Sequence, residues 1–490
     1  MVIVPTAPGL RASTPVRGGT IMLPPMLVTL ALGLWGIRRQ NSMWGDEAVT
    51  CEVAHRSASQ IWRTVQHVDM VHGVYYLLMH VLFCLWDGGP VALRLPSVVA
   101  MSLAAGGVAL LGRRLAGPRA GLLAGLVFPL IPLVQRYAQE GRSYAIVCAL
   151  VTWSTCLLLH ATDRSTGRRW AGYAVLLWGA AMCHELAVLV VPAHGIALVL
   201  LGCPRAVIRA WAVAAGCVVA GLLPLVVLSR RQAGQVAWIG WPDPLQLLGV
   251  TAMALVGLWC ARHQIRGREL SRLSALALPV LLLPGLLLLT AAVVQPLFVD
   301  RYVLYCTIGF ALLLGVELDR LWASRPRPGR SARAAWVVGA AVAVLATVAV
   351  LALVALHLRT PQSRHDDATA VGHAVRQAAH PGDGLLFIPT GHRVWTAADP
   401  RDTRGLTDLA LAQDPVSSDT LDGVELPARD IPTRMRAFSR IVVVHDPAGE
   451  PPAGAAGERA KSSTLRDSFH ACGPTVDVTG ARITAYCLNG

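Results

Sequence analysis

Charged residues are scarce in this chain. Asp, Glu, Lys and Arg together make up 15% of the 490 residues, and Lys461 is the only lysine. An average soluble domain has about a quarter of its residues charged. The sequence also has no internal repeat, no low-complexity tract and no Cys/His spacing typical of structural zinc. The sequence therefore indicates neither a repeat architecture nor a zinc module. The low fraction of charged residues is not typical of a soluble protein.

Apolar residues are instead in excess. The chain is 54% hydrophobic with a mean hydropathy of +0.52, and before about residue 357 the excess is concentrated in runs of roughly 17–23 apolar residues. An α-helix needs about 20 such residues to cross a bilayer. The pattern excludes a soluble enzyme, a disordered chain and a DNA-binding protein despite the net charge of +14, so we expect no nucleic-acid partner.

We therefore predict a polytopic α-helical membrane protein with about eleven transmembrane helices. A cytoplasmic tail (1–20) precedes a transmembrane module (21–357) with a long first outer loop (38–90), and a small α/β domain (358–490) follows. The spans are expected at residues 21–37, 91–112, 119–135, 143–161, 170–183, 186–203, 210–228, 245–261, 273–293, 303–321 and 335–357.

The distribution of arginine predicts the orientation. The chain up to residue 358 carries 29 arginines and 13 acids, and cytoplasmic loops are enriched in basic residues. With the N-terminus inside, 19 of these arginines lie on the cytoplasmic side and nine of the 13 acids lie outside. An odd number of spans then places the C-terminal domain outside. The Arg-rich, nearly lysine-free composition is typical of a GC-rich bacterial genome, which indicates the plasma membrane.

The C-terminal segment has the pattern of a small extracytoplasmic α/β domain. Helices are expected at 366–379 and 458–468, and strands at 385–388, 441–444, 475–478 and 482–487. Cys472 and Cys487 flank adjacent strands in a compartment where disulfides persist, so we expect them to pair. Cys51 and Cys84, both in the first outer loop, are a weaker candidate pair.

Two adjacent acids, Asp46 and Glu47, directly follow the first predicted span. Two carboxylates at a membrane surface are costly to desolvate. A purely structural interpretation is that Asp46 caps a helix and Glu47 lies in its first turn. Other polar segments on the same side of the membrane favour a functional interpretation.

These segments carry carboxylates, histidines and arginines at the outer ends of separate spans. They are His67-Val-Asp69-Met-Val-His72-Gly-Val-Tyr75-Tyr76, Gln135-Arg-Tyr-Ala-Gln-Glu140-Gly-Arg142-Ser-Tyr144 and Val299-Asp300-Arg301-Tyr302. The interiors of the predicted spans hold almost no ionisable groups. We therefore expect the four elements to converge on one polar pocket at the outer lipid boundary.

In their order along the chain, these motifs resemble those of the GT-C superfamily of membrane glycosyltransferases. The likeness is to the branch with the protein O-mannosyltransferases and the lipid A aminoarabinose transferases. It includes Arg94-Leu-Pro-Ser97 at the second span and covers about residues 20–320. The family often has His-Pro-Pro where this chain has His72-Gly73-Val74, which leaves donor and acceptor preference open. The resemblance implies a GT-C fold and transfer, with inversion, of a sugar from a polyprenyl-phosphate carrier on the outer face.

The resemblance also implies that Asp46 is the catalytic base. The chemistry agrees, because a single displacement needs a carboxylate to take the proton from the attacking hydroxyl. Glu47 either takes part directly or holds Asp46. The leaving lipid phosphate needs charge stabilisation, and our candidates are Arg142 and Arg301, since a guanidinium group binds phosphate oxygens bidentately. Arg301 could otherwise be an interfacial anchor.

Asp69, His72 and Glu140 are further site candidates. Asp69 and His72 could hold a divalent metal ion together with Glu47 or Glu140, as some relatives do. No spacing demands a metal, so we assign no metal ligand and regard a divalent ion as an open alternative. Glu140 could instead pair with Arg142 across its short loop.

The leading hypothesis is a hexosyl- or pentosyltransferase similar to glycosyltransferase family 39. It would move a single sugar, with mannose as the first guess, from polyprenyl phosphate to a hydroxyl of a glycan, lipid or protein. The alternative is a ligase or polymerase that uses a pyrophosphate-linked glycan, which would need a larger cavity and more than two arginines. A transporter would place charges near the bilayer midplane in two related halves, and a receptor would leave the outer acids and arginines without a purpose.

Overall fold

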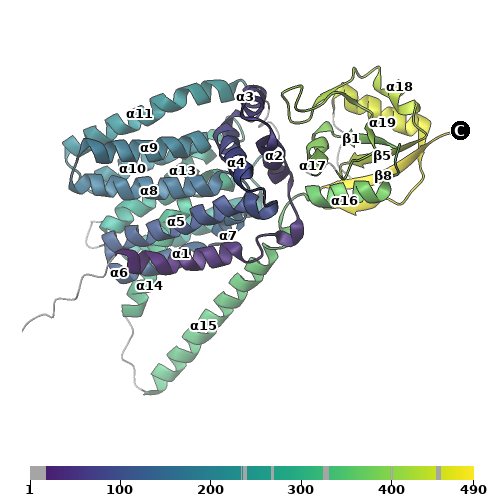
Figure 1. Cartoon of the computed structure of the whole chain (residues 1–490). Helices are drawn as coiled ribbons and strands as arrows, with labels where there is room; N and C mark the ends of the chain where they lie inside the picture. Colours follow the sequence, from purple (N-terminus) through teal and green to yellow (C-terminus); the bar gives the residue numbers. More distant parts are fainter. Residues whose placement is uncertain are drawn as a thin grey trace, which may run out of the picture.

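The computed structural model describes residues 18–232, 234, 240–265, 270–323, 330–397, 399, 401–447 and 454–490. Most of the predicted tail, 1–20, therefore lies outside the described residues. Figure 1 shows a bundle of long helices, a small domain with a β-sheet, and short helices between the two. The predicted class, a helical membrane protein with a C-terminal α/β domain, is confirmed.

The bundle packs through small residues. It contains α1 (Gly18–Leu34), α5 (Pro90–Ala116), α6 (Pro118–Val127), α7 (Pro132–Ala138), α8 (Tyr144–Asp163), α9 (Gly167–Cys183), α10 (Val190–Leu200), α11 (Arg205–Arg230), α12 (Pro244–Arg262), α13 (Arg272–Ala291) and α14 (Cys306–Ala323). Helix α6 lies so close to α5 that a Cβ atom at Gly121 would be 2.4 Å from the carbonyl oxygen of Ala109. Such contacts hold membrane helices together, because lipid gives little hydrophobic drive between them.

Each of the eleven predicted spans falls on a helix or a pair of helices. By length and hydropathy alone, six described helices can cross a bilayer, and the pair α6–α7, bent by 65°, would be a seventh. Helix α9 has only 17 residues, and α14 carries Glu317, Asp319 and Arg320 near its end. Helix α15 (Arg330–His357) leaves the bundle and leads to the sheet domain (Figure 1). The total of eleven spans therefore stays a prediction.

The segment predicted as the first outer loop (38–90) is helical throughout most of its length. It folds into α2 (Gly45–His55), α3 (Ala58–His67), the 3-10 turn η2 (Met70–His72) and α4 (Gly73–Leu85). Helices α2 and α3 are separate, because Ser57 starts a new helix through reciprocal hydrogen bonds with Gln60. Val81 and Leu85 of α4 are exposed, as expected for a helix that lies along a membrane surface.

The C-terminal domain is a mixed sheet with helices on both faces. Its strands are β1 (Gly384–Ile388), β2 (Thr407–Asp408), β5 (Arg440–His445), β6 (Phe469–Ala471), β7 (Val476–Val478) and β8 (Ala481–Leu488), beside the pair β3 (Leu411–Gln413) and β4 (Val424–Glu425). The order is β2-β1-β5-β8-β6, with β7 also on β8. Strands β1, β2 and β5 are parallel, whereas β8 is antiparallel to its partners.

The alternation of side chains along β1 explains the two-faced core. Leu385 and Phe387 pack with Val371 of α16 (Ala368–Ala378) on one face. Leu386 packs on the other face, where α18 (Ile431–Arg436) and α19 (Ala456–Ser468) contribute Ile431 and Leu465. Successive strand residues point to opposite faces, so a fully apolar strand is expected where both faces are covered.

Lys461 of α19 is fully buried in this domain. Its ammonium group donates a 2.9 Å hydrogen bond to the carbonyl oxygen of Phe387 at the end of β1. It also pairs with Glu425 at 2.8 Å and Glu458 at 3.3 Å. A buried charge is tolerated when it is paired and hydrogen-bonded, so Lys461 ties α19 to β1 and β4.

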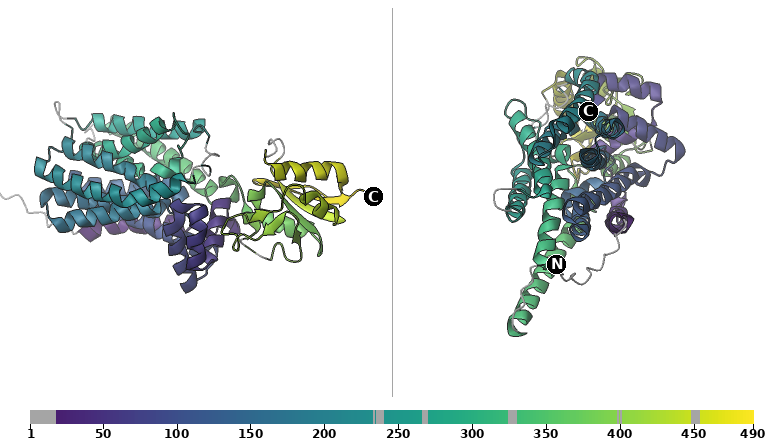
Figure 2. Two further views of the ribbon diagram at one scale, coloured as in Figure 1. Left: turned by 90° about the horizontal axis from the view of Figure 1, so that it is seen from above. Right: turned by 90° about the vertical axis from the view of Figure 1, so that its left-hand side faces the viewer.

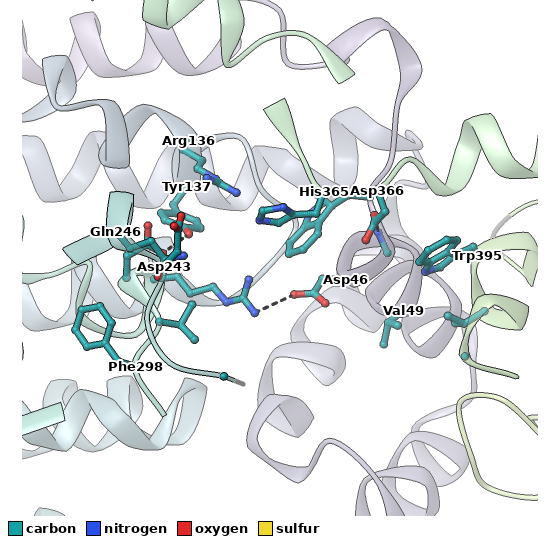
Figure 3. Close-up of a pocket in the computed structure, with 18 of the residues that line it drawn as sticks. Asp46, Val49, Arg136, Tyr137, Asp243, Gln246, Phe298, His365, Asp366 and Trp395 are labelled. Atoms are coloured by element: carbon teal, nitrogen blue, oxygen red, sulfur yellow. Dashed lines mark hydrogen bonds and ion pairs between the residues drawn. The ribbon is translucent and has the colours of Figure 1, made fainter. Parts of the chain in front are cut away.

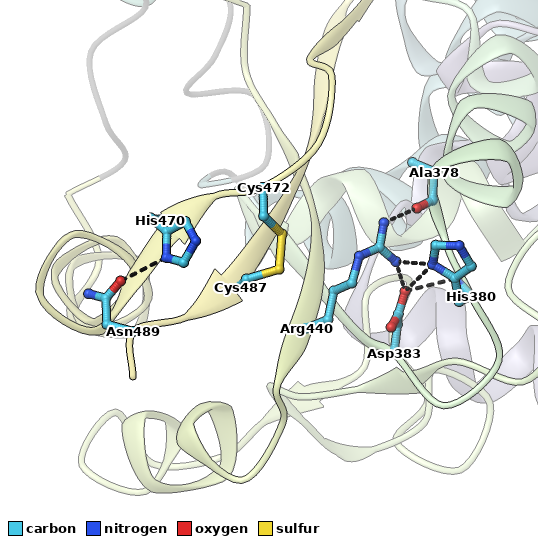
Figure 4. Close-up of a disulfide and its surroundings, with 8 residues drawn as sticks. All are labelled: Ala378, His380, Asp383, Arg440, His470, Cys472, Cys487 and Asn489. Atoms are coloured by element: carbon cyan, nitrogen blue, oxygen red, sulfur yellow. Dashed lines mark hydrogen bonds and ion pairs between the residues drawn. A yellow bond between two sulfur atoms is a disulfide. The ribbon is translucent and has the colours of Figure 1, made fainter.

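Cys472 and Cys487 form a disulfide that joins the segment after β6 to β8 (Figure 4). This is the pairing expected from their flanking positions. The weaker candidate pair is wrong, because Cys51 and Cys84 are both free. Each of these two sulfur atoms lies 3.8 Å from a histidine nitrogen of its own helix, α2 or α4.

Direct contacts join α2 and α3 to the C-terminal domain, and the left view in Figure 2 shows the short helices that follow α1 beside this domain. Arg63 of α3 pairs with Asp419 at 3.1 Å. Arg56, at the end of α2, donates to the carbonyl oxygen of Thr420 at 2.7 Å. Helix α17 (Arg393–Ala397) packs on α2. The domain is therefore held at the end of the bundle where the predicted site residues lie.

Candidate active site

A cavity of about 800 Å³ opens between the bundle loops, α2 and the C-terminal domain (Figure 3). Small-molecule sites usually have about 300–1,000 Å³. Charged and aromatic side chains line it from all three parts, including Trp44 and Asp46, then Arg136, Tyr137, Asp243, Asp300 and Arg301, and finally His365, Asp366, His392, Trp395 and Asp422. Two of the predicted site residues, Asp46 and Arg301, thus share one cavity.

Asp46 lies in the first turn of α2, just after the extended residue Trp44. Its carboxylate oxygens lie 3.4 Å from Nη2 of Arg142 and 3.7 Å from Nη2 of Arg301, and 28% of its side chain is exposed. Burial raises the pKa of Asp46, but the two guanidinium groups more than offset this, so the pKa lies below its usual value. Asp46 is therefore ionised at neutral pH and accessible from the cavity, as a general base must be.

Arg142 is bound to protein groups behind Asp46. Its Nη1 donates a 3.0 Å hydrogen bond to the hydroxyl of Tyr76 and lies 3.7 Å from a carboxylate oxygen of Asp69. The Tyr76 hydroxyl in turn donates to Asp69. Arg142 is 6% exposed and is not among the residues that line the described cavity. Arg142 therefore contacts Asp46 directly, and its contact with the donor phosphate stays a prediction.

Arg301 does line the cavity, and three aromatic rings surround it. Its guanidinium carbon lies 5.7 Å from the ring centroid of Trp44, 5.6 Å from that of Tyr144 and 5.8 Å from that of Tyr302. Cations are attracted to such ring faces, so the rings fix Arg301 beside Asp46. Arg136 lines the same cavity, although sequence reasoning assigned it no role. Arg136 lies in the same motif as Glu140 and Arg142, and this position could have identified it as a site candidate.

Glu47 is completely enclosed. Arg94 donates to both of its carboxylate oxygens at 2.7 and 2.6 Å, the backbone N–H of Gly141 donates at 2.9 Å, and Arg39 lies 3.5 Å away. Burial alone would raise the pKa of Glu47. The cations and the N–H outweigh this effect and lower the pKa to about 2. The oxygens of Glu47 therefore already have partners and its side chain has no exposed surface, and its direct role in catalysis stays a prediction. Glu47 holds α2 against the bundle.

The three other candidates lie behind the cavity wall. Asp69 and His72 approach to 3.9 Å, and the ring of His72 packs near those of Tyr144 and His184. Glu140 is 1% exposed and lies 3.6 Å from Arg364, which follows α15. The alternative pairing of Glu140 with Arg142 is thereby replaced by a contact with the C-terminal part of the chain.

These partners do not fit a divalent metal ion. Glu47 faces two arginines, Glu140 faces Arg364 and Asp69 faces Arg142, so each proposed carboxylate ligand already has a guanidinium partner. Within the described ranges, no group of three His, Cys, Asp or Glu side chains is arranged to hold a metal ion. The donor set therefore does not support the metal considered from the sequence.

Comparisons with known proteins bear on the fold of this chain. The family model of dolichyl-phosphate-mannose-protein mannosyltransferases matches residues 73–229. The structure is similar to that of ArnT from Cupriavidus metallidurans bound to undecaprenyl phosphate, with a TM-score of 0.60 and 14% identity over 96% of this chain and 98% of that one. It is also similar to the Archaeoglobus fulgidus oligosaccharyltransferase tethered with an acceptor peptide, with a TM-score of 0.54 and 11% identity over 96% of this chain and 74% of that one. A search of curated proteins finds no match.

This chain has the GT-C glycosyltransferase fold. The GT-C fold that the motif resemblance implied is thereby confirmed, and the chain is placed among multi-pass membrane proteins.

In this GT-C chain, the C-terminal domain forms one wall of the cavity. His365 and Asp366 precede α16, and Trp395 lies on α17 with its ring stacked on that of His392 at 4.2 Å. Sequence reasoning assigned no site to this domain. No local signal could have found these residues, because they reach the cavity only through the packing of α17 on α2.

Proposed function

We propose that the chain is an inverting glycosyltransferase that moves a single sugar from a polyprenyl-phosphate carrier to an acceptor hydroxyl. The description of the matching family model names a dolichyl-phosphate mannose donor, so mannose is the first candidate. The similar ArnT structure contains undecaprenyl phosphate. The arginine distribution favours a cytoplasmic N-terminus, with the cavity and the C-terminal domain on the outer face of the plasma membrane.

In the proposed reaction Asp46 is the base. The acceptor oxygen attacks the anomeric carbon while its proton passes to the Asp46 carboxylate. The bond between the anomeric carbon and the phosphate oxygen breaks, and polyprenyl phosphate leaves with the electron pair. Arg301, together with Arg136, would stabilise the charge on this phosphate, and each such preorganised donor contributes roughly 3–4 kcal/mol to transition-state stabilisation.

The observation that carries this proposal is the ionised Asp46 beside Arg301 in the cavity wall. The two groups lie 3.7 Å apart, so a base and a phosphate ligand border the same space. Arg142 and its partners Tyr76 and Asp69 hold the base from behind. The acceptor, a glycan, lipid or protein hydroxyl, would enter from the side of the C-terminal domain.

The test is turnover by the purified full chain in nanodiscs, with radiolabelled polyprenyl-phosphate sugars and membrane extract as the acceptor source. We expect the wild type to release polyprenyl phosphate and transfer label to a new product. Asp46→Asn should lower turnover by about 10²–10⁴-fold, with donor binding and thermal unfolding close to wild type.

Asp87→Asn is the matched control, because Asp87 lies in the same loop with 55% of its side chain exposed. It should retain full turnover. Wild-type turnover by Asp46→Asn would remove Asp46 from the mechanism. Transfer only from a pyrophosphate-linked glycan would assign the ligase or polymerase alternative instead.

A further inference from the structure

Helix α2, which carries Asp46, lacks a cap from its own sequence. Its N-cap residue is Trp44, whose side chain makes no capping hydrogen bond. The first N–H groups of a helix have no partner within the helix, and a side-chain oxygen or an anion normally satisfies them. The turn that holds the proposed base therefore depends on groups from elsewhere.

Asp366 supplies the missing acceptor from the C-terminal domain. Its Oδ1 accepts a 2.5 Å hydrogen bond from the backbone N–H of Gly45, a residue 321 positions earlier in the chain. The hydroxyl of Thr369 accepts a second bond, of 3.1 Å, from the N–H of Met43. A carboxylate at this end also interacts favourably with the helix dipole. The start of α2 is therefore capped by another domain.

The packing leaves this contact little freedom. A Cβ atom at Gly45 would lie 2.7 Å from Nε1 of Trp395 and 3.2 Å from Oδ2 of Asp366. The backbone after Asp366 is also fixed, because the N–H of Asp367 donates to the carbonyl oxygen of Thr479 at 3.0 Å. Asp366 therefore meets α2 in one defined geometry, at the edge of the cavity (Figure 3).

We propose that Asp366 is a positioning residue of the transfer site, which caps α2 from the C-terminal domain and so sets how Asp46 faces Arg301 and the cavity. This inference deepens the function proposed above and rests on it. It makes the C-terminal domain a working part of the site, because the orientation of the base depends on a carboxylate from that domain.

The charged surroundings of Asp366 make the cap sensitive to pH. Asp46 and Glu47 face it from α2, His365 and Asp367 flank it, and α17 presents the uncharged Trp395. Burial and the neighbouring carboxylates raise the pKa of Asp366 and the Gly45 N–H opposes them, so that the pKa lies at about 6. The cap is therefore anionic above about pH 6 and loses its charge as the pH falls through that value.

Amide hydrogen exchange of the full chain in nanodiscs tests the cap without any substrate. We expect Asp366→Ala to speed exchange at Gly45 and the next amides by about tenfold or more, because a hydrogen bond to a charged group is lost. Asp419→Asn, which breaks the more remote domain contact with Arg63, should leave these amides unchanged. Unchanged exchange in Asp366→Ala would overturn the proposal.

Turnover across pH 5–8 tests the effect on transfer. The wild type should lose activity below about pH 6, where the cap is neutralised. Asp366→Asn should lack this acid limb, and Asp366→Ala should lower kcat several-fold with little change in the KM for the donor. An acid limb that persists in Asp366→Asn would overturn the proposal. A wild type that transfers no sugar would instead refute the proposed function, and the exchange result would still decide the cap.

Discussion

Asp46 and Glu47 are neighbours in one helical turn but have opposite surroundings. Asp46 is partly exposed to the cavity and faces two arginines at 3.4 and 3.7 Å. Glu47 is fully enclosed by Arg94, Arg39 and a backbone N–H. Successive helical residues point about 100° apart, so one faces the cavity while the other faces the bundle. Conservative amide substitutions should separate the two roles.

Glu47→Gln should reduce stability far more than Asp46→Asn does. Removal of one partner of a buried ion pair leaves the other charge unpaired and costs about 3–5 kcal/mol. The folded pKa of Glu47 is about 2, below its ordinary value of 4.5. Its contribution to stability is therefore present above about pH 4.5 and is lost as the pH falls towards 2. Thermal unfolding at pH 7 and pH 4 measures both effects, and a wild-type midpoint for Glu47→Gln would contradict them.

Arg301→Ala should weaken donor binding by about 10–100-fold, since hydrogen bonds to charged groups contribute about 1.5–3 kcal/mol. Arg301→Lys should recover part of the affinity, because it restores the charge without the planar fork. Binding of a polyprenyl phosphate measured by thermal shift provides the readout. Arg38→Ala, a change of an exposed arginine in the first outer loop, is the control. If Arg301→Ala changes only stability, this arginine is an interfacial anchor.

At the scale of elements, α2 is a short helix fixed from two sides. Arg94 of α5 holds it against the bundle through Glu47, and Asp366 and Trp395 hold its first turn from the C-terminal domain. Isolated helices of this length, 11 residues, are marginal in water. Its position therefore depends on these tertiary contacts.

Gly45→Ala tests the tightness of this junction. The new Cβ would overlap Nε1 of Trp395 at 2.7 Å, and such overpacking costs about 1–3 kcal/mol. We expect a lower unfolding temperature and reduced turnover. Gly216→Ala in α11, where a Cβ would meet nothing within 4 Å, should be neutral or slightly stabilising. Equal behaviour of the two variants would contradict the tight contact.

The sequence predicted the long helices and the strands β1, β5, β7 and β8, because apolar runs and β-branched runs such as Ile441–Val444 carry local signals. It missed the short strands β2, β3, β4 and β6. It also placed Asp46 and Arg301 on the same side of the membrane, since Asp46 follows the first predicted span and Arg301 precedes the span predicted at 303–321. It could not predict that Arg142 holds Asp46, that Arg364 pairs with Glu140, or that Asp366 caps α2. These contacts join residues from different helices or different domains, and only the packing of the chain brings them together.

At the scale of the whole molecule, the membrane bundle and the C-terminal domain share one cavity. The domain is stabilised by a buried ion cluster at Lys461 and by the disulfide between Cys472 and Cys487. The disulfide closes a short loop, with a sequence separation of 15. Cys487 lies on β8, which pairs with β5, β6 and β7.

Loss of the disulfide should therefore loosen the domain and, with it, the cavity wall. Closing a loop of this length contributes about 3 kcal/mol in the chain-entropy model. We expect Cys487→Ser to increase proteolysis of the C-terminal domain and to lower turnover in proportion. Cys217→Ser, a change of an exposed free cysteine in α11, is the control. Unchanged proteolysis of Cys487→Ser would show that the sheet holds without the bridge.

The burial of Lys461 has a practical consequence for labelling. It is the only lysine in the sequence, and its amine is enclosed by two carboxylates and a carbonyl oxygen. The folded chain thus offers amine-reactive dyes and cross-linkers no accessible lysine. Slow modification of Lys461 would report opening of the space between α19 and β1, so one reagent could time the local unfolding of this domain within the intact membrane protein.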